Sequence, residues 1–392
     1  MTPSERSTAG NEVIRAGFIP LVDAAPLVVA SRLGFAEAEG LRIELLRETS
    51  WATLRDRLAV RHLDIAHMLG PMALADSLGL TPLPVGLIVP MALGTAGNTV
   101  TVSRAVRAEL AELGAGTSLD ASSTAEAVAR LTADRQRTGK PPLTIAIVHP
   151  YSAHHYQLAY WLGFAGVRPG IDVELVIVPP SLMTAALESA RIDGFCVGEP
   201  WGSAAVALGA GHVLTTSAHI WHRSPDKVLG VRHAFAEASP ERLGRLLRAI
   251  YKAACWCDDA ANHQQLARLL SASEIIGQPA EVITSALAMR GAGGPAATTC
   301  GDGFLSFAAD GAMLARESHA VWFYSQMVRW GQATLDAKAI AAIKSVYRPD
   351  LFSAAVETKS GDTASDVAFF DGTSFDATDI PGYLRRFAIR EA

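Results

Sequence analysis

The sequence predicts an α/β protein with two similar lobes, each a mostly parallel sheet flanked by helices. In the first part of the chain, short apolar segments alternate with helical patterns, which predicts strands at 15–20, 41–45 and 63–68 and helices at 24–32 and 51–60. The same order recurs later, with strands predicted at 143–148, 173–178 and 194–197 and helices at 154–163 and 181–190. A regular alternation of strands and helices is typical of parallel sheets covered by helices.

The length of the chain also favours more than one lobe. With 392 residues, the usual domain size suggests about two or three domains. We expect the first lobe to comprise 12–100 and 229–392, with a helical C-terminal extension, and the second lobe to comprise 101–228. The apolar run 83–93 predicts a strand entering the crossover between the lobes. Further helices are predicted at 243–257, 262–270, 280–289, 318–331 and 337–346, with a loop at 291–303 and loop structure after Arg348, as an extension wrapping one lobe.

The composition is that of an ordinary globular protein, and the overall charge gives no reason to expect binding to nucleic acid or membranes. Hydrophobic residues make up 49% and charged residues 19%, within the usual range. The net charge is -5, so a cation that serves binding must be a local feature.

The N-terminus and the cysteines predict a cytoplasmic location. The first dozen residues are polar and lack the basic segment and apolar core of a signal peptide, so we expect 1–11 to be a disordered leader. The chain has no uninterrupted run of ~20 apolar residues, the length needed to span a bilayer. The four cysteines are unevenly placed, which argues against a disulfide framework and favours a reducing compartment: Cys196, Cys255, Cys257 and Cys300.

Three predicted loops should meet at one edge of the first sheet. They follow the strands and comprise 19–23, 48–51 and 68–72. In open α/β sheets, ligands bind outside the carboxyl ends of the strands, so we expect these loops to begin a binding site. Asp23 is a good N-cap for the helix at 24–32, whose first turn offers free backbone N–H groups.

Short motifs along most of the chain resemble one family. They comprise GFIPL at 17–21 with Asp23 and APLVVA at 25–30, SW at 50–51, RDRLA at 55–59, LDIAHML at 63–69, GNTVTVS at 97–103, HHYQLAYWL at 154–162, FCVGEPW at 195–201, DKVLGV at 226–231 and RPDLF at 348–352. Their order and spacing resemble the solute-binding proteins of nitrate and bicarbonate ABC transporters, the NrtA and CmpA group, and the cytoplasmic nitrate sensors of the NasS type. The resemblance implies a two-lobed, periplasmic-binding-protein-like (type II) clamshell.

The resemblance also implies an anion site with one permanent positive charge. Lys227, in DKVLGV, stands where this family places the nitrate-binding lysine and where bicarbonate binders depart from the pattern. His154 aligns with the family's anion-binding histidine, and its place at a helix start suits an anion because the helix dipole favours negative charge. His149 and His155 compete for this role; beside Pro150, His149 is better explained by loop packing.

Other candidates come from the donor chemistry that a small oxyanion needs. Trp51 carries an indole N–H, a donor without an acceptor, at a predicted strand-to-helix junction after Ser50. Asn98 lies near the polar amide of the family, although Gly97 or Thr99 could shift that alignment by one residue. Glu199 would repel an anion unless its charge were engaged, so we expect it to orient Lys227 or His154. Secondary candidates for contact with the ligand are Met68, Pro71 and Gly198.

Catalytic and metal-binding motifs are not found. The cysteines at 255 and 257 have no second pair for zinc, and neither a nucleophile motif nor a phosphate-binding motif occurs. We expect no enzyme activity, no metal and no cofactor. The resemblance implies a cytoplasmic nitrate or nitrite sensor that holds an RNA-binding antiterminator of the NasT (ANTAR) type until nitrate releases it, without contacting nucleic acid itself. The alternative is the periplasmic nitrate-binding subunit of an ABC importer.

Overall fold

The computed structural model describes residues 12–289, 304–357 and 369–388 and contains two five-stranded sheets. The expected leader at 1–11 and the expected loop at 291–303, with Cys300, lie outside the described residues. The first sheet has the order β2-β1-β3-β11-β4 and defines the first lobe; its strands are β1 (Glu12–Phe18), β2 (Leu41–Arg47), β3 (Ile65–Leu69), β4 (Leu87–Ile88) and β11 (Lys227–Arg232). The second sheet has the order β10-β6-β9-β7-β8 and defines the second lobe; its strands are β6 (Asn98–Ser103), β7 (Leu143–Ile147), β8 (Val173–Ile177), β9 (Gly194–Gly198) and β10 (Gly211–Thr216).

Both sheets are mixed and are built in the same way. In the first, β1 is parallel to β2 and β3, while β11 is antiparallel to β3, with Lys227 opposite Leu69. In the second, β7 is parallel to β8 and β9, while β6 is antiparallel to β9, with Asn98 opposite Gly198. Each lobe therefore places one strand that crosses from the other lobe, β6 or β11, inside its sheet. The α/β two-lobed fold class is confirmed, with antiparallel strands added to each parallel core.

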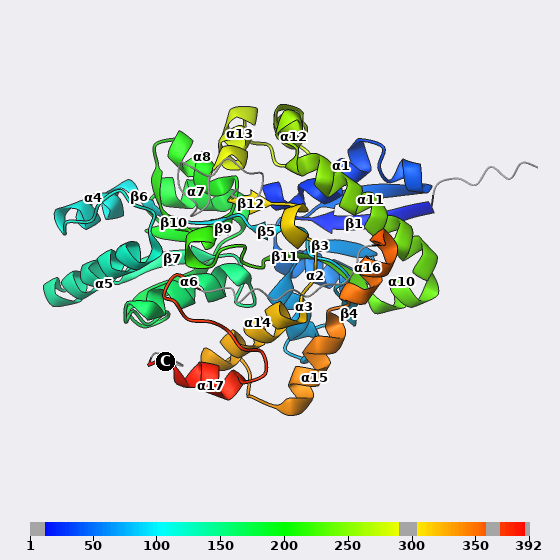
Figure 1. The fold of residues 1–392 in the computed structure, drawn as a ribbon. Coiled ribbons are helices and arrows are strands. Elements are labelled where there is room, and N and C mark those ends of the chain that lie inside the picture. The colour runs from blue at the N-terminus through cyan, green and yellow to red at the C-terminus, as the bar shows by residue number, and fades with distance from the viewer. Residues whose placement is uncertain (1–11, 290–303, 358–368, 389–392) are drawn as a thin grey trace, which may run out of the picture.

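Helices flank both sheets, and the two lobes lie side by side (Figure 1). Around the first sheet lie α1 (Ala25–Arg32), α2 (Trp51–Ala59), α3 (Gly70–Ser77), α10 (His233–Ala238) and α11 (Pro240–Asp258). Around the second lie α4 (Arg104–Glu112), α5 (Ala121–Thr138), α6 (Ala153–Phe164), α7 (Pro180–Glu188), α8 (Trp201–Ala207) and α9 (Ser217–Ile220). Later helices are α12 (His263–Leu270), α13 (Ala280–Ala288), α14 (Glu317–Arg329), α15 (Ala337–Val346), α16 (Pro349–Val356) and α17 (Ile380–Arg385). A small ladder joins β5 (Thr95–Ala96) to β12 (Leu305–Ser306).

Two expectations from the sequence are wrong in detail. The strand predicted at 83–93 shrinks to the two residues of β4, because Pro84 and Pro90 lack the N–H that a continuous ladder needs. The tail after Arg348 contains α16 and α17, which are too short to reveal a helical period. Both begin with a helix-start signal: Pro349 lies in the first turn of α16, and Asp379 caps α17 by accepting from the backbone N–H of Gly382 at 2.8 Å.

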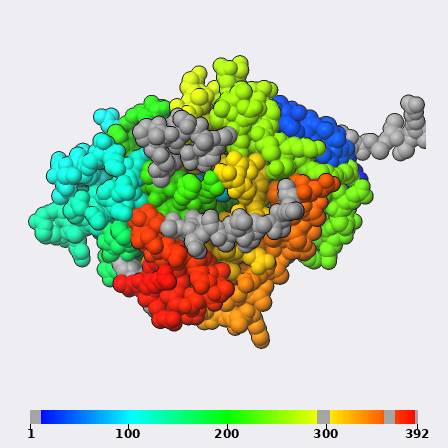
Figure 2. Space-filling view, viewed as in Figure 1, coloured from blue at the N-terminus to red at the C-terminus, as the bar shows by residue number. Residues whose placement is uncertain are grey.

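The C-terminal part of the chain contacts both lobes. Helix α14 packs against α3 of the first lobe and α6 of the second. After it, the hydroxyl of Tyr160 on α6 donates to Asp371 at 2.9 Å, and the rings of Tyr160 and Phe369 stack at 4.7 Å. In the space-filling view, the red C-terminal residues accordingly lie between the orange segment and the second lobe (Figure 2).

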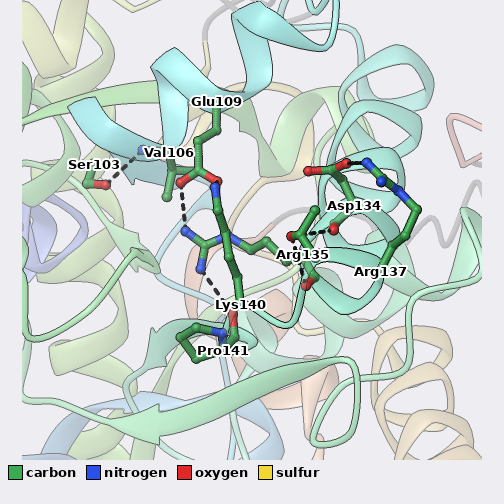
Figure 3. Close-up of polar contacts among 9 residues, drawn as sticks. Ser103, Val106, Glu109, Asp134, Arg135, Arg137, Lys140 and Pro141 are labelled. Carbon is green, nitrogen blue, oxygen red and sulfur yellow. Dashed lines mark hydrogen bonds and ion pairs between the residues drawn. The ribbon is translucent and has the colours of Figure 1, made fainter.

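A polar network stabilises the side of the second lobe that faces away from the first lobe. Glu109 on α4 accepts from Arg135 at 2.8 Å and from Lys140 at 3.2 Å, while Arg135 also donates to the carbonyl of Pro141 (Figure 3). The hydrogen bond from Arg135 lowers the pKa of Glu109 against the effect of its partial burial. This network ties α4 to α5 and is remote in the fold from the junction of the lobes (Figure 1).

Candidate functional site

A buried lysine lies at the junction of the lobes. Lys227 is the first residue of β11 and is 1% exposed. Its ammonium nitrogen Nζ is 3.1 Å from Oδ2 of Asp23 and 3.4 Å from Nε2 of His154, and it also forms an ion pair with Asp226. An ammonium has three N–H donors, so all three already have an acceptor. We call Asp23, Trp51, His67, His154, Asp226 and Lys227 together the Lys227 cluster.

Asp23 belongs to this cluster and does not cap a helix. A short 3-10 turn, η1 (Val22–Ala24), precedes α1, which begins at Ala25 without a side-chain cap. The Asp23 carboxylate instead contacts Lys227 and lies 2.8 Å from Nε2 of His67. A charged partner is a stronger attraction than a neutral backbone amide. Although burial would raise the pKa of Asp23, the charge of Lys227 and the contact with His67 outweigh it and lower that pKa strongly. The prediction of a cap is therefore wrong.

Trp51 reaches the cluster from the start of α2. Ser50 caps that helix by accepting from the backbone N–H of Thr53 at 3.2 Å, which places Trp51 in the first turn. The Trp51 ring centroid is 5.4 Å from that of His67 and 5.8 Å from Nζ of Lys227. Among the described residues, its buried indole Nε1–H has no hydrogen-bond partner.

His154 comes from the second lobe, in the first turn of α6, where Ser152 is the N-cap. Burial and the nearby charge of Lys227 lower the pKa of His154 well below its usual value, so the ring is neutral. Because a lysine ammonium can only donate, Nε2 of His154 accepts and the ring proton lies on Nδ1. That Nδ1–H has no partner among the described residues. His149 and His155 are engaged elsewhere: Nδ1 of His149 accepts from Tyr151, and Nδ1 of His155 lies 2.7 Å from the carbonyl of Pro150.

Asn98 begins β6 beside the cluster. Its backbone N–H donates to Ser217 at 3.1 Å, and its side-chain amide donates to Gln157 at 3.2 Å. The two neighbouring residues that could have taken the place of Asn98 in the alignment have different roles. Gly97 has a positive φ of 87° and no side chain, while Thr99 forms a hydrogen bond with Glu199.

Glu199 has different partners from those expected. Its carboxylate accepts from the backbone N–H of Ser203 at 3.1 Å, in the first turn of α8, and from Thr99, whereas the expected contact with Lys227 or His154 is not among its contacts with described residues. Burial raises the pKa of Glu199 to about 7.

Of the secondary candidates, Gly198 lies next to the cluster. A side chain at Gly198 would place its Cβ 3.2 Å from Oδ2 of Asp23, so glycine permits this close approach of the lobes. Met68 is buried in β3 opposite Val228, and Pro71 lies in the first turn of α3.

Two hydrogen bonds join the lobes next to the cluster. The backbone N–H of Val22 donates to the carbonyl of Glu199 at 2.7 Å. The indole Nε1–H of Trp201, on α8, donates to the carbonyl of Pro20 at 3.0 Å. The loop before α1 therefore contacts the loop after β9 directly, and the Lys227 cluster is closed over by both lobes.

Sequence reasoning missed several members of the site. His67 lies within the apolar strand IAHML, where a buried polar side chain is a signal of function or pairing. Asp226 directly precedes Lys227 and forms an ion pair with it, so it adds a negative charge to the site. Gln157 follows His154 by three residues, which places both on one face of α6.

The cluster has an excess of negative charge. Asp23 and Asp226 are two carboxylates beside one ammonium, and both are almost fully buried. Burial lowers the pKa of Lys227, but the charges of Asp226 and Asp23 outweigh that effect and raise it. Within the described ranges, no group of three or more His, Cys, Asp or Glu side chains is arranged to hold a metal ion. The helices of the described residues include none long and apolar enough to cross a membrane.

Comparison with known proteins assigns the family. The sequence model of the NMT1-like family matches residues 7–271. The chain belongs to this family. The nitrate import ATP-binding protein NrtC of Synechocystis sp. PCC 6803 is 34% identical to this chain over 383 residues, which is 95% of this chain and 55% of that protein. This chain therefore spans about half the length of that relative.

Other relatives match over most of both chains. The nitrate/nitrite binding protein NrtA of Nostoc sp. PCC 7120 is 30% identical over 396 residues, which is 96% of this chain and 85% of that protein. The crystal structure of the periplasmic nitrate-binding protein NrtA from Synechocystis PCC 6803 superposes with a TM-score of 0.84 at 29% identity, over 96% of this chain and 98% of that one. This member of the NMT1-like family is thus homologous to the NrtA proteins over its full two-lobed fold.

Proposed function

We propose that this protein binds a small oxyanion, nitrate or nitrite, at the Lys227 cluster between its two lobes. The observation that carries the proposal is a pair of buried donors: the indole N–H of Trp51 and the Nδ1–H of His154 have no partner among the described residues. An unpaired buried donor costs about 1–3 kcal/mol, so a fold retains such groups where a ligand pairs with them. Oxyanion oxygens are suitable acceptors for both.

The homology supports the same ligand class. Relatives that match most of this chain are named as nitrate/nitrite binding proteins. A site between two lobes also suits a small ligand, because closing the lobes removes water and strengthens every hydrogen bond to the anion.

Calorimetry with nitrate, nitrite and bicarbonate tests the proposal. Lys227 supplies a positive charge without a metal, so nitrate should bind equally well in the presence of a chelator, and bicarbonate should bind more weakly. If nitrate affinity is lost on chelation, or bicarbonate binds more tightly, the ligand assignment is wrong.

For the cellular role, the proposal is a cytoplasmic nitrate sensor that holds an RNA-binding antiterminator of the NasT (ANTAR) type without ligand and releases it when nitrate binds. The resemblance of the sequence motifs to those of nitrate sensors supports this role. Nitrate can shift the partner equilibrium only by the difference between its affinities for the two states, so nitrate should bind the partner-free protein more tightly. The second candidate is the solute-binding subunit of an ABC importer, favoured by the full-length likeness to NrtA.

Two experiments separate these roles. In a pull-down with the antiterminator, a sensor should lose its partner as nitrate is added, and Trp51→Phe should raise the nitrate concentration needed. Deleting the gene should then give expression of nitrate assimilation genes without nitrate, whereas loss of an importer subunit should give cells starved at low external nitrate. A deletion strain that still requires nitrate for induction would exclude the sensor.

A further inference from the structure

The charge of the Lys227 cluster raises a problem for an anionic ligand. Asp23 and Asp226 both contact the single ammonium of Lys227, and His154 is neutral. With both carboxylates ionised, these groups sum to one excess negative charge before any anion arrives. A second buried negative charge is heavily penalised unless it is compensated.

The hydrogen-bond count leads to the same problem. The three N–H donors of Lys227 point to Asp23, Asp226 and His154, so an oxyanion can bind the ammonium only by replacing one of these acceptors. Protonating a carboxylate makes it a weaker acceptor and turns it into a donor. A carboxyl group that gains a proton therefore both frees a lysine donor and offers a new O–H to the anion.

Asp226 is the group placed to take that proton. Among the described residues, Asp226 forms one ion pair, with Lys227, whereas the Asp23 carboxylate contacts both Lys227 and His67. Burial and the negative charge of Asp23 raise the pKa of Asp226 against the pull of Lys227, while the pKa of Asp23 is lowered.

Asp226 also has polar and titratable neighbours outside the Lys227 cluster. Asn98 on β6 forms a hydrogen bond with Asp226. The thiol of Cys196 on β9 has a raised pKa, chiefly because it is buried and in smaller part because of the negative charge of Asp226. On another side, Asp226 lines a cavity of about 140 Å³ together with Arg223, Asp310, Arg316 and His319; Arg223 and Asp310 form an ion pair with each other. Glu199 directly follows β9, and its carboxylate accepts from the backbone N–H of Ser203 at 3.1 Å and from Thr99.

We propose that the anion enters the Lys227 cluster together with one proton from solvent, which is carried by the carboxyl group of Asp226. This rests on the proposed function and deepens it: the site binds nitrate as an anion and proton pair. Affinity then depends on pH, because the proton must be taken up at each binding event. Above the pKa of the Asp226 carboxyl, affinity falls about tenfold for each pH unit.

Calorimetry of nitrate binding at about pH 8, in two buffers with different ionisation enthalpies, measures the protons taken up. We expect about one proton for each nitrate bound, and a linear loss of affinity at higher pH. In Asp226→Asn, whose amide imitates the protonated acid, proton uptake should vanish and affinity should become independent of pH. Glu199→Gln is the matched control, since it neutralises a buried carboxyl at the same junction, and it should retain the uptake.

The outcomes are distinct. Nitrate binding by the unaltered protein with equal heats in both buffers overturns the inference and leaves the proposed function standing. Uptake that persists in Asp226→Asn and vanishes in Glu199→Gln also overturns it, because the proton then resides on Glu199. Absence of nitrate binding at every pH overturns both proposals. The buffer comparison needs only the unaltered protein, so it decides the matter even if Asp226→Asn does not fold.

Discussion

The ammonium Nζ of Lys227 lies 3.1 Å from Oδ2 of Asp23, and both side chains are almost fully buried. This contact joins the start of β11, where the chain returns to the first lobe, to the turn before α1. The residue that we propose as the positive charge for an anion is therefore also part of the packed structure of its own lobe. Its removal should affect folding as well as binding.

Replacing Lys227 by alanine should destabilise the protein by about 3–5 kcal/mol, because two buried carboxylates lose the cation that they share. Urea unfolding measures the change. Lys344→Ala is the control: this lysine is exposed, and a change of no more than about 0.5 kcal/mol is expected there. Equal, small effects at both positions would show that the buried ion pairs contribute little.

Glu199 should make the stability of the protein fall as pH rises. Burial raises its pKa from 4.5 to about 7, so its contribution is fully present below the unfolded value of 4.5 and is lost as pH rises through about 7. The loss amounts to at most about 3 kcal/mol. Glu199→Gln should remove this part of the pH dependence in thermal unfolding between about pH 4.5 and 8.

Glu109→Gln is a control of opposite sign. The pKa of Glu109 is lowered, chiefly by its hydrogen bond from Arg135, so its contribution is present above the unfolded value of 4.5 and is lost as pH falls below that value. Its removal should therefore change stability at neutral pH and leave the acid side unaffected. A Glu199 variant with the same pH profile as the unaltered protein would contradict a raised pKa.

The sequence allowed part of the site to be predicted because local signals place its residues. Ser50 and Ser152 cap α2 and α6, which puts Trp51 and His154 in first turns, and Lys227 lies within a motif shared with a known family. The alternation of apolar and helical segments likewise predicted β1, β2 and β3 of the first sheet and β7, β8 and β9 of the second. These features depend on neighbours in the sequence.

The parts of the site that were not predicted depend on contacts between segments that are far apart in the sequence. Asp23 carries a good capping signal, yet it pairs with Lys227 because β11 returns to the first lobe beside β3. Nothing near Asp226 or His67 in the sequence tells which carboxylate or ring will face the ammonium. The engagement of Glu199 by Thr99 and Ser203 is decided by the pairing of β6 with β9.

Trp51→Phe should weaken nitrate binding without destabilising the protein. Phenylalanine keeps an aromatic ring against His67 and Lys227 but removes the unpaired indole N–H, so the loss of affinity should be about 1 kcal/mol, roughly fivefold, by calorimetry. Trp161→Phe is the matched control, because the indole N–H of Trp161 donates to the carbonyl of Ala121 at 2.8 Å. That variant should lose stability and retain affinity. The reverse pattern would place the ligand away from Trp51.

Trp201 should influence affinity through the contact between the lobes. Its indole N–H donates to the carbonyl of Pro20 at 3.0 Å, and this hydrogen bond exists only when the loop before α1 meets the start of α8. Trp201→Phe removes it, so the closed arrangement loses about 1 kcal/mol relative to an open one. A ligand that binds the closed arrangement must then supply this free energy, which should lower nitrate affinity by up to about fivefold. Small-angle scattering should show a larger radius of gyration for the nitrate-free variant than for the unaltered protein, and saturating nitrate should remove the difference. Unchanged affinity together with unchanged scattering would mean that this hydrogen bond does not control closure.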